Sequence, residues 1–422
     1  MNKRREVLAF MLPLLFLTGT AYAQDGCEQP PTLIESVTVF DGESIRPTAH
    51  VLIRCERIGG VFSADEFPEV SANAVVIDGR GKTLMPGLFD SHGHTFQRVM
   101  LERSLDFGVT TVLDMGSTSH DFVANIKAED QEGQATDRAD LFGAVLWVTA
   151  PGSHGTQFGE VPTLTNPQDA ADFVAQRVED GADFIKIIYD NFKMIDRPVP
   201  TLSTATMAAV VAAAHTQGKL AVVHSRDLEA WADVIAAGAD GFVHAPVDAV
   251  PDAQMIAAIR EKKMFVSPNL ALARPAGARL IDDPVIGPLL SERERGRLLD
   301  FFAKHREGGD QVAYDTVAAL HEAGVTLLAG SDSPNGGTTV GASMYVELEL
   351  LVELGLSPIE ALQTATSNPA RVFGLDDRGR IAAGLLADVL LVEGRPDEDI
   401  LAMRRIHTIW KAGASHPGPV RQ

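Results

Sequence analysis

Residues 84–94 read LMPGLFDSHGH, an apolar run that ends in a polar segment carrying two histidines. Seven further strand-like apolar runs follow: VTTVLDM (109–115), LFGAVLWVT (141–149), DFIKII (183–188), LAVVH (220–224), GFVH (241–244), MFVSP (264–268) and VTLLAGS (325–331). Amphipathic helical stretches lie between several of these runs, at 204–217, 228–237, 252–262 and 310–323. Eight alternating strand and helix units are typical of a (β/α)8 TIM barrel. A doubly wound sheet is the competing fold, but it would have fewer strands and a glycine-rich phosphate loop, which we do not find.

Both ends of the chain are rich in short strands. Residues 32–77 contain β-branched runs broken by Gly, Pro and Asp, and GRIAAGLLADVLLVEG (379–394) and IHTIWKAG (406–413) return to that pattern. We therefore predict a small β-sandwich domain built from both chain ends beside the barrel. The predicted division is a signal peptide at 1–23, the amino-terminal segment of the sandwich at 24–84, the metal-binding barrel at 85–372 and the carboxyl-terminal segment of the sandwich at 373–422.

The first residues have the pattern of an export signal. Basic residues 3–5 precede an apolar run at 7–17, and Ala-Tyr-Ala at 21–23 resembles a signal-peptidase site, so the mature chain is predicted to begin at Gln24 in the periplasm or outside the cell. No later stretch has the roughly 18 apolar residues of a membrane anchor. The export signal fits either the Sec or the twin-arginine route. Cys27 and Cys55 form either a disulfide or two free thiols.

The composition excludes several classes of protein. The 57 Asp and Glu outnumber the 36 Lys and Arg, so the net charge is −21, which disfavours nucleic acid as a partner. Hydrophobic residues form 45% of the chain, which excludes disorder as its main state. We expect a small-molecule or short-peptide substrate, no nucleic acid and no membrane anchor, and leave a homo-oligomer open.

Polar residues at the ends of the predicted strands indicate a metal site. Functional side chains of a parallel barrel lie at the carboxyl ends of its strands. Two histidines two apart on an extended chain point to the same side, as a chelating pair must. The candidate ligands are His92, His94, Lys186, His224, His244 and Asp332, and their nitrogen and oxygen atoms suit Zn²⁺, with Mn²⁺ or Co²⁺ as alternatives.

Lys186 is the most informative of these residues. Its neighbours in DFIKII are apolar, and a buried lysine usually has a partner. One interpretation is a salt bridge to an acid of the barrel. The other is that a lysine with a lowered pKa reacts with CO₂, and that the resulting carbamate bridges two metal ions.

The motifs LMPGLFDSHGH, DFIKI, AVVH, GFVH and GSDSP, in this order, resemble the amidohydrolase superfamily, as does LSPIEALQTATSNPARVFGL at 356–375. The chain looks most like the imidazolonepropionase and Xaa-Pro dipeptidase (prolidase-like) branch. The resemblance implies that His92 and His94 bind one metal, that Lys186 as carbamate bridges to a second metal held by His224 and His244, and that Asp332 is both a ligand and the general base.

The resemblance also implies that His154, in a Gly-Ser-His-Gly segment, contacts the substrate or its oxyanion. Ser153 replaces the more usual glycine of that segment, which leaves the shape of this loop open. Arg226 is a candidate clamp for a substrate carboxylate or a helix cap, and Asn269 is a candidate substrate contact.

We therefore predict an exported binuclear amidohydrolase, dipeptidase-like, that cleaves an amide of a small peptide or N-acyl amino acid with a metal-bridging hydroxide. One alternative is a mononuclear cyclic-amide hydrolase or deaminase in which Lys186 is unmodified. A second is a barrel that binds a ligand without catalysis.

Overall fold

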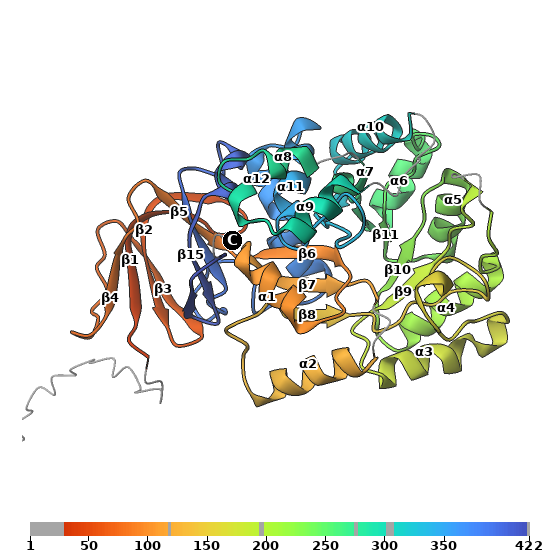
Figure 1. Cartoon of the computed structure of the whole chain (residues 1–422), viewed down its shortest axis with the longest axis horizontal. Coiled ribbons are helices and arrows are strands. Elements are labelled where there is room, and N and C mark those ends of the chain that lie inside the picture. Colours follow the sequence, from red (N-terminus) through yellow and green to blue (C-terminus); the bar gives the residue numbers. More distant parts are fainter. Residues whose placement is uncertain (1–28, 117–119, 194–197, 274–276, 301–307, 420–422) are drawn as a thin grey trace, which may run out of the picture.

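A computed structural model describes residues 29–116, 120–193, 198–273, 277–300 and 308–419 of the chain. The predicted signal peptide and Cys27, and with it the predicted cysteine pairing, lie outside the described residues. Figure 1 shows strands from the two ends of the chain side by side, next to a larger region that contains most of the helices. No helix in the described ranges combines the length and apolar character that a membrane crossing requires.

One eight-stranded sheet, here called the terminal sheet, joins the two ends of the chain. Its order is β16-β15-β14-β5-β1-β2-β3, with β4 also paired to β1. The contact between the ends is the antiparallel pair of β5 and β14, in which Leu84 lies opposite Leu391. Its strands are β1 (Thr32–Phe40), β2 (Ile45–Arg54), β3 (Arg57–Ser63), β4 (Val75–Asp78), β5 (Lys82–Pro86), β14 (Val389–Glu393), β15 (Ile406–Lys411) and β16 (Ala414–His416). The two ends therefore share one sheet, and the second layer of a sandwich stays a prediction.

Eight parallel strands form the centre of the larger region. They lie in two sheets, β6-β7-β8 and β9-β10-β11-β12-β13. Single parallel bridges link the sheets on both sides, from Val148 to Ile187 and from Gly93 to Ser333, which is the circular neighbour order expected of a barrel. These strands are β6 (Leu88–Gly93), β7 (Val109–Asp114), β8 (Asp140–Gly143), β9 (Ile185–Ile188), β10 (Ala221–His224), β11 (Gly241–Val243), β12 (Phe265–Ser267) and β13 (Thr326–Leu327).

The chain passes from the terminal sheet to the parallel strands at Gly87. Strand β5 ends at Pro86 and β6 begins at Leu88. A Cβ atom at position 87 would lie 2.2 Å from Oγ1 of Thr110, so only glycine allows this close approach to the neighbouring strand. The LMPGLFD run is thus divided between two sheets, and the predicted domain division itself stays a prediction.

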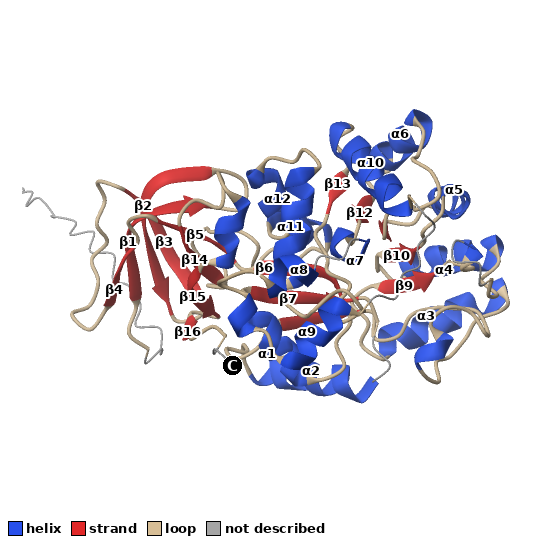
Figure 2. Ribbon diagram, turned by 45° about the horizontal axis from the view of Figure 1, so that its top comes forward, coloured by secondary structure: helices blue, strands red, loops and turns tan. Residues whose placement is uncertain are grey.

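Helices cover the parallel strands on the outside (Figure 2). The predicted helices at 204–217, 228–237, 252–262 and 310–323 are confirmed to within one residue at each end. Ser203, Asp227 and Asp252 cap three of them by accepting a hydrogen bond from a backbone N–H of the first turn. The α-helices are α1 (Arg98–Asp106), α2 (His120–Glu132), α3 (Ala170–Glu179), α4 (Thr204–Thr216), α5 (Leu228–Ala237), α6 (Ala253–Glu261), α7 (Leu270–Ala273), α8 (Gly277–Ile281), α9 (Glu292–Leu299), α10 (Gly309–Glu322), α11 (Ser343–Glu353), α12 (Pro358–Thr364) and α13 (Ser367–Val372).

A buried group of four charges, here called the interface charge cluster, joins the terminal sheet to the start of β8. Lys411 of β15 lies 3.0 Å from Asp140 of β8 and 3.1 Å from Asp388, and Arg378 also pairs with Asp140. Lys411 is fully buried, and the other three are at most 6% exposed. Two buried cations therefore face two buried anions at the amino ends of the parallel strands, opposite the carboxyl ends where the sequence predicts the site, and Arg378 also pairs with the partly exposed Asp377.

Candidate metal centre

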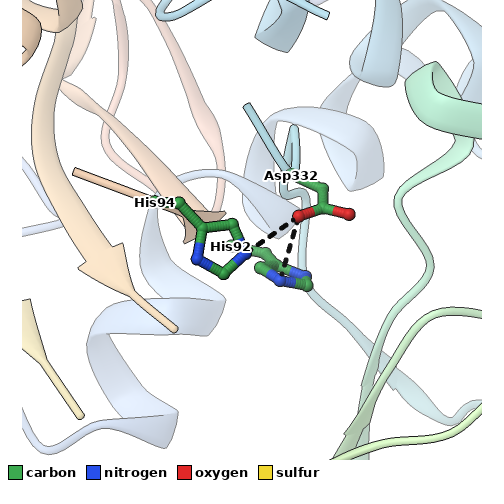
Figure 3. Close-up of side chains that lie close together, drawn as sticks. All are labelled: His92, His94 and Asp332. Carbon is green, nitrogen blue, oxygen red and sulfur yellow. Dashed lines mark ion pairs between the residues drawn. The ribbon is translucent and has the colours of Figure 1, made fainter. Parts of the chain in front are cut away.

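His92, His94 and Asp332 converge on one point (Figure 3). Oδ1 of Asp332 lies 3.3 Å from Nε2 of His92 and 3.1 Å from Nε2 of His94. His92 lies near the end of β6 and His94 directly follows that strand, while Asp332 follows β13 and precedes Ser333, which is bridged to Gly93 of β6. Parallel strands present their carboxyl ends on the same side, which is how residues that follow the first and the last of the parallel strands meet.

The hydrogen bonds of the Nδ1 atoms of His92 and His94 indicate that these histidines and Asp332 can bind a cation. Nδ1 of His94 lies 2.8 Å from the carbonyl of Gly116, which can only accept, so this nitrogen carries the proton. Nδ1 of His92 lies 2.9 Å from Oδ1 of Asn269, whose Nδ2 donates to the Gly330 carbonyl and thereby orients the amide. Both Nε2 lone pairs then face a carboxylate oxygen, an arrangement that is stable only with a proton or a metal cation between them.

The remaining candidate ligands border the same cavity. Lys186, His224 and His244 line it together with His92, His94 and Asp332. Nε2 of His244 lies 3.8 Å from Oδ2 of Asp332. Five imidazoles form a continuous row in which successive ring centres are 4.4 to 5.2 Å apart, in the order His94, His92, His244, His224 and His154. The structure thus brings together all six residues that the sequence predicts as ligands.

Lys186 lies on β9 with 2% of its surface exposed. Among the described residues, its ammonium group has no side-chain hydrogen bond or ion pair, and Asp332 and Asp114 act on it only as nearby charges, so the salt bridge that the sequence allows is absent there. Burial lowers the pKa of Lys186 to about 7, against the opposing effect of Asp332 and Asp114. A substantial fraction of the amine is then uncharged at neutral pH, the form that reacts with CO₂.

The cavity has a volume of about 390 Å³ and apolar walls beyond its polar floor. Phe96, Trp147 and Phe158 line it, and Phe96 and Phe158 are 42% and 57% exposed. His154 lies on the wall with its ring 4.7 Å from that of His224, and its contact with a substrate stays a prediction. An apolar cavity with a few convergent polar groups is typical of a site for small molecules.

Two predicted substrate contacts lie elsewhere. Asn269 is not among the residues that line the cavity, and its amide is engaged by His92 and the Gly330 carbonyl. Arg226 is likewise absent from the lining and donates through Nε to Asp190 at 2.8 Å. Both side chains thus lie outside the cavity lining, and their direct contact with a substrate stays a prediction: Asn269 is engaged by the candidate ligand His92, whereas the Nη2 atom of Arg226 is buried without a hydrogen-bond partner among the described residues.

Two buried acids that support the site were not assigned this role from the sequence. Asp90 accepts hydrogen bonds from the hydroxyl and the backbone N–H of Ser331 and from the backbone N–H of His92. Asp114 accepts from the N–H groups of Thr95 and Gly116, which holds the carbonyl that orients His94. Burial raises the pKa of both acids to about 6. The only sequence signal for them is that each lies near the end of a strand.

Backbone conformation is a further feature of the site. His244, Asn269 and Asp332 have φ values of 75°, 56° and 53°, in the left-handed region that residues other than glycine seldom occupy. Each of them follows or ends a parallel strand, and such strain is concentrated at functional sites.

The chain belongs to the amidohydrolase family, whose model matches residues 83–415. Over 98 residues it is 38% identical to imidazolonepropionase of Deinococcus deserti, a match that covers 22% of this chain and 24% of that protein. Over 380 residues it is 23% identical to adenine deaminase 3 of Rhizobium meliloti, which covers 84% of this chain and 53% of the relative. The chain thus spans about half or less of the length of these curated relatives.

A solved Xaa-Pro dipeptidase with bound methionine has a similar fold. The TM-score is 0.74 at 23% identity, with 92% of this chain and 99% of that chain covered. The predicted relationship to the amidohydrolases is therefore confirmed by the family model, and the likeness to the dipeptidase shows a shared fold.

Proposed function

We propose that this protein is an exported, binuclear metal-dependent amidohydrolase that cleaves the amide of a small peptide or an N-acyl amino acid. The observation that carries the proposal is the convergence of His92, His94 and Asp332 with Lys186, His224 and His244 around one cavity. Family membership supports a hydrolase acting on carbon–nitrogen bonds, and the dipeptidase fold supports a peptide-like substrate.

The residues present fit two divalent ions. His92, His94 and Asp332 would hold one, and His224 and His244 the other, with the carbamate of Lys186 between them. Bound there, such ions polarise a carbonyl and make water a stronger acid at neutral pH. Asp332 would take the proton of the attacking water and return it to the leaving nitrogen. His154, on the cavity wall, would donate a hydrogen bond to the substrate oxygen.

Metal analysis coupled to a substrate screen tests this function. We expect about two Zn²⁺, Mn²⁺ or Co²⁺ ions per chain and hydrolysis of at least one substrate among dipeptides and N-acyl amino acids. Lactones and aminopurines serve as the contrasting classes. One ion per chain with full activity would support the mononuclear alternative, and metal binding without hydrolysis of any class would support a binding protein.

Changing Lys186 to arginine is expected to remove nearly all activity, by about 10³-fold or more in kcat, if the carbamate is one of the metal bridges. Arginine keeps the charge but cannot form a carbamate at neutral pH. The measurement is kcat together with metal content after growth in bicarbonate. Lys127→Arg is the matched control, because this lysine pairs with Asp183 outside the cavity lining. Activity of Lys186→Arg within tenfold of the original protein would contradict the bridge.

A further inference from the structure

Asp190 is a buried carboxylate beside the candidate metal centre that has no part in the proposed reaction. It follows β9, four positions after Lys186, and is 2% exposed. Its Oδ2 lies 3.2 Å from Nε2 of His224 and 2.8 Å from Nε of Arg226. Its Oδ1 accepts the backbone N–H of Phe192 at 2.8 Å. Three groups from two neighbouring strand ends therefore meet on one side chain.

These contacts determine which nitrogen of His224 can bind a cation. A carboxylate paired with a guanidinium accepts hydrogen bonds and donates none, so Nε2 of His224 is the nitrogen that carries the proton. Nδ1 is then left with the free electron pair. His92 and His94 show the opposite arrangement, because their Nδ1 atoms donate and their Nε2 atoms are left free.

Asp190 is not itself suited to bind the ion. His154, Asp190 and His224 offer ligand atoms within 4.8 Å of one another, which is close enough for a shared ion. However, both oxygens of Asp190 already accept hydrogen bonds, and the guanidinium of Arg226 at 2.8 Å would repel a second cation at the same oxygen. The contacts favour an orienting role over coordination.

Asp190 also reaches the substrate side of the cavity through Phe192. The ring of Phe192 lies 4.4 Å from that of His154 and 5.3 Å below the guanidinium of Arg226. Phe192 has a φ of 56°, a conformation that the hydrogen bond from its N–H to Asp190 helps to hold. One carboxylate thereby connects His224 with the packing that holds His154.

We propose that Asp190 is a positioning residue that fixes His224 for metal coordination through Nδ1 and holds Phe192 against His154. This inference rests on the proposed function, in which His224 is a ligand of the second ion. In this proposal, Arg226 holds Asp190 in place through their ion pair. Partners of this kind behind a histidine ligand typically change metal affinity by about 10–100-fold.

The test compares two variants that act on opposite halves of the centre. Asp190→Asn should weaken binding of the second Zn²⁺ ion by about 10–100-fold and leave the first unchanged, as measured by competition with a chromogenic chelator. Asn269→Ala, which removes the partner of His92, should weaken the first ion and leave the second unchanged. Equal weakening of both ions by Asp190→Asn, or no effect on either, would overturn the proposal.

A second measurement uses the metal-free protein, so it does not depend on how many ions bind. Nitrogen NMR of histidine-labelled protein should show His224 as the tautomer protonated at Nε2, and Asp190→Ala should remove this preference. An unchanged His224 signal would overturn the positioning role. A single ion per chain in the unaltered protein, with the expected NMR change, would instead overturn the binuclear function and leave the role of Asp190 standing.

Discussion

Replacing Asp332 with asparagine is expected to lower kcat by about 10²–10⁴-fold while the protein stays folded. Asparagine has nearly the same shape, but its amide cannot take a proton from water at neutral pH. It is also a weaker ligand facing the Nε2 atoms of His92 and His94, which lie 3.3 and 3.1 Å from the aspartate oxygen. The measurement is kcat and KM on the best substrate from the screen, with metal content determined on the same sample.

The ionised state of Asp332 follows from its surroundings. Burial favours the neutral acid, but His92, His94 and Lys186 together hold the pKa of Asp332 well below its ordinary value. The carboxylate is therefore available as a proton acceptor across the neutral range. Asp282→Asn is the control, since this exposed acid lies outside the cavity lining and should leave kcat unchanged. A kcat for Asp332→Asn within tenfold of the original would show that another group is the base.

Replacing Lys411 with methionine is expected to lower the free energy of unfolding by about 3–5 kcal/mol. Methionine fills much of the same space but leaves Asp388 without its cation in a site where Lys411 is fully buried. Burial opposes the charged form of Lys411, but the carboxylates of Asp388 and Asp140 raise its pKa. Urea denaturation followed by circular dichroism measures the change.

Two further variants separate charge balance from packing. Lys411→Met combined with Asp388→Asn restores neutrality and should recover some of the lost stability. Arg80→Ala breaks the exposed pair with Asp78 and should shift the denaturation midpoint far less. If Lys411→Met costs no more than Arg80→Ala, the interface charge cluster does not stabilise the contact between the terminal sheet and the parallel strands.

Local sequence patterns were sufficient to predict most of the helices and strands and to select the candidate metal ligands. The helix 228–237 follows from the spacing of its apolar residues and from Asp227 as its cap, and both are local properties. His92, His94 and Asp332 could be selected because each ends an apolar run, and a parallel arrangement of strands brings such ends together. The run at 141–149 shows the limit of this reasoning, because only Asp140–Gly143 forms a strand there.

The partners of these residues could not be predicted in the same way. The sequence predicts Asn269 as a substrate contact, whereas in the structure its side chain contacts Nδ1 of His92 from a backbone with a φ of 56°. Asp190 lies in a segment with no recognisable motif. Its role depends on its contacts with His224 and Arg226, which the sequence does not predict.

By itself, then, the sequence determined that the strands alternate with helices and that histidines, a lysine and an aspartate lie at their ends, because periodicity and strand position are local. Only the tertiary structure decided which nitrogen of His92 and of His94 faces Asp332 and which distant charges compensate one another, as Asp140 and Lys411 do. Hydrogen-bond direction and the cost of burying charge depend on contacts between residues that are far apart along the chain.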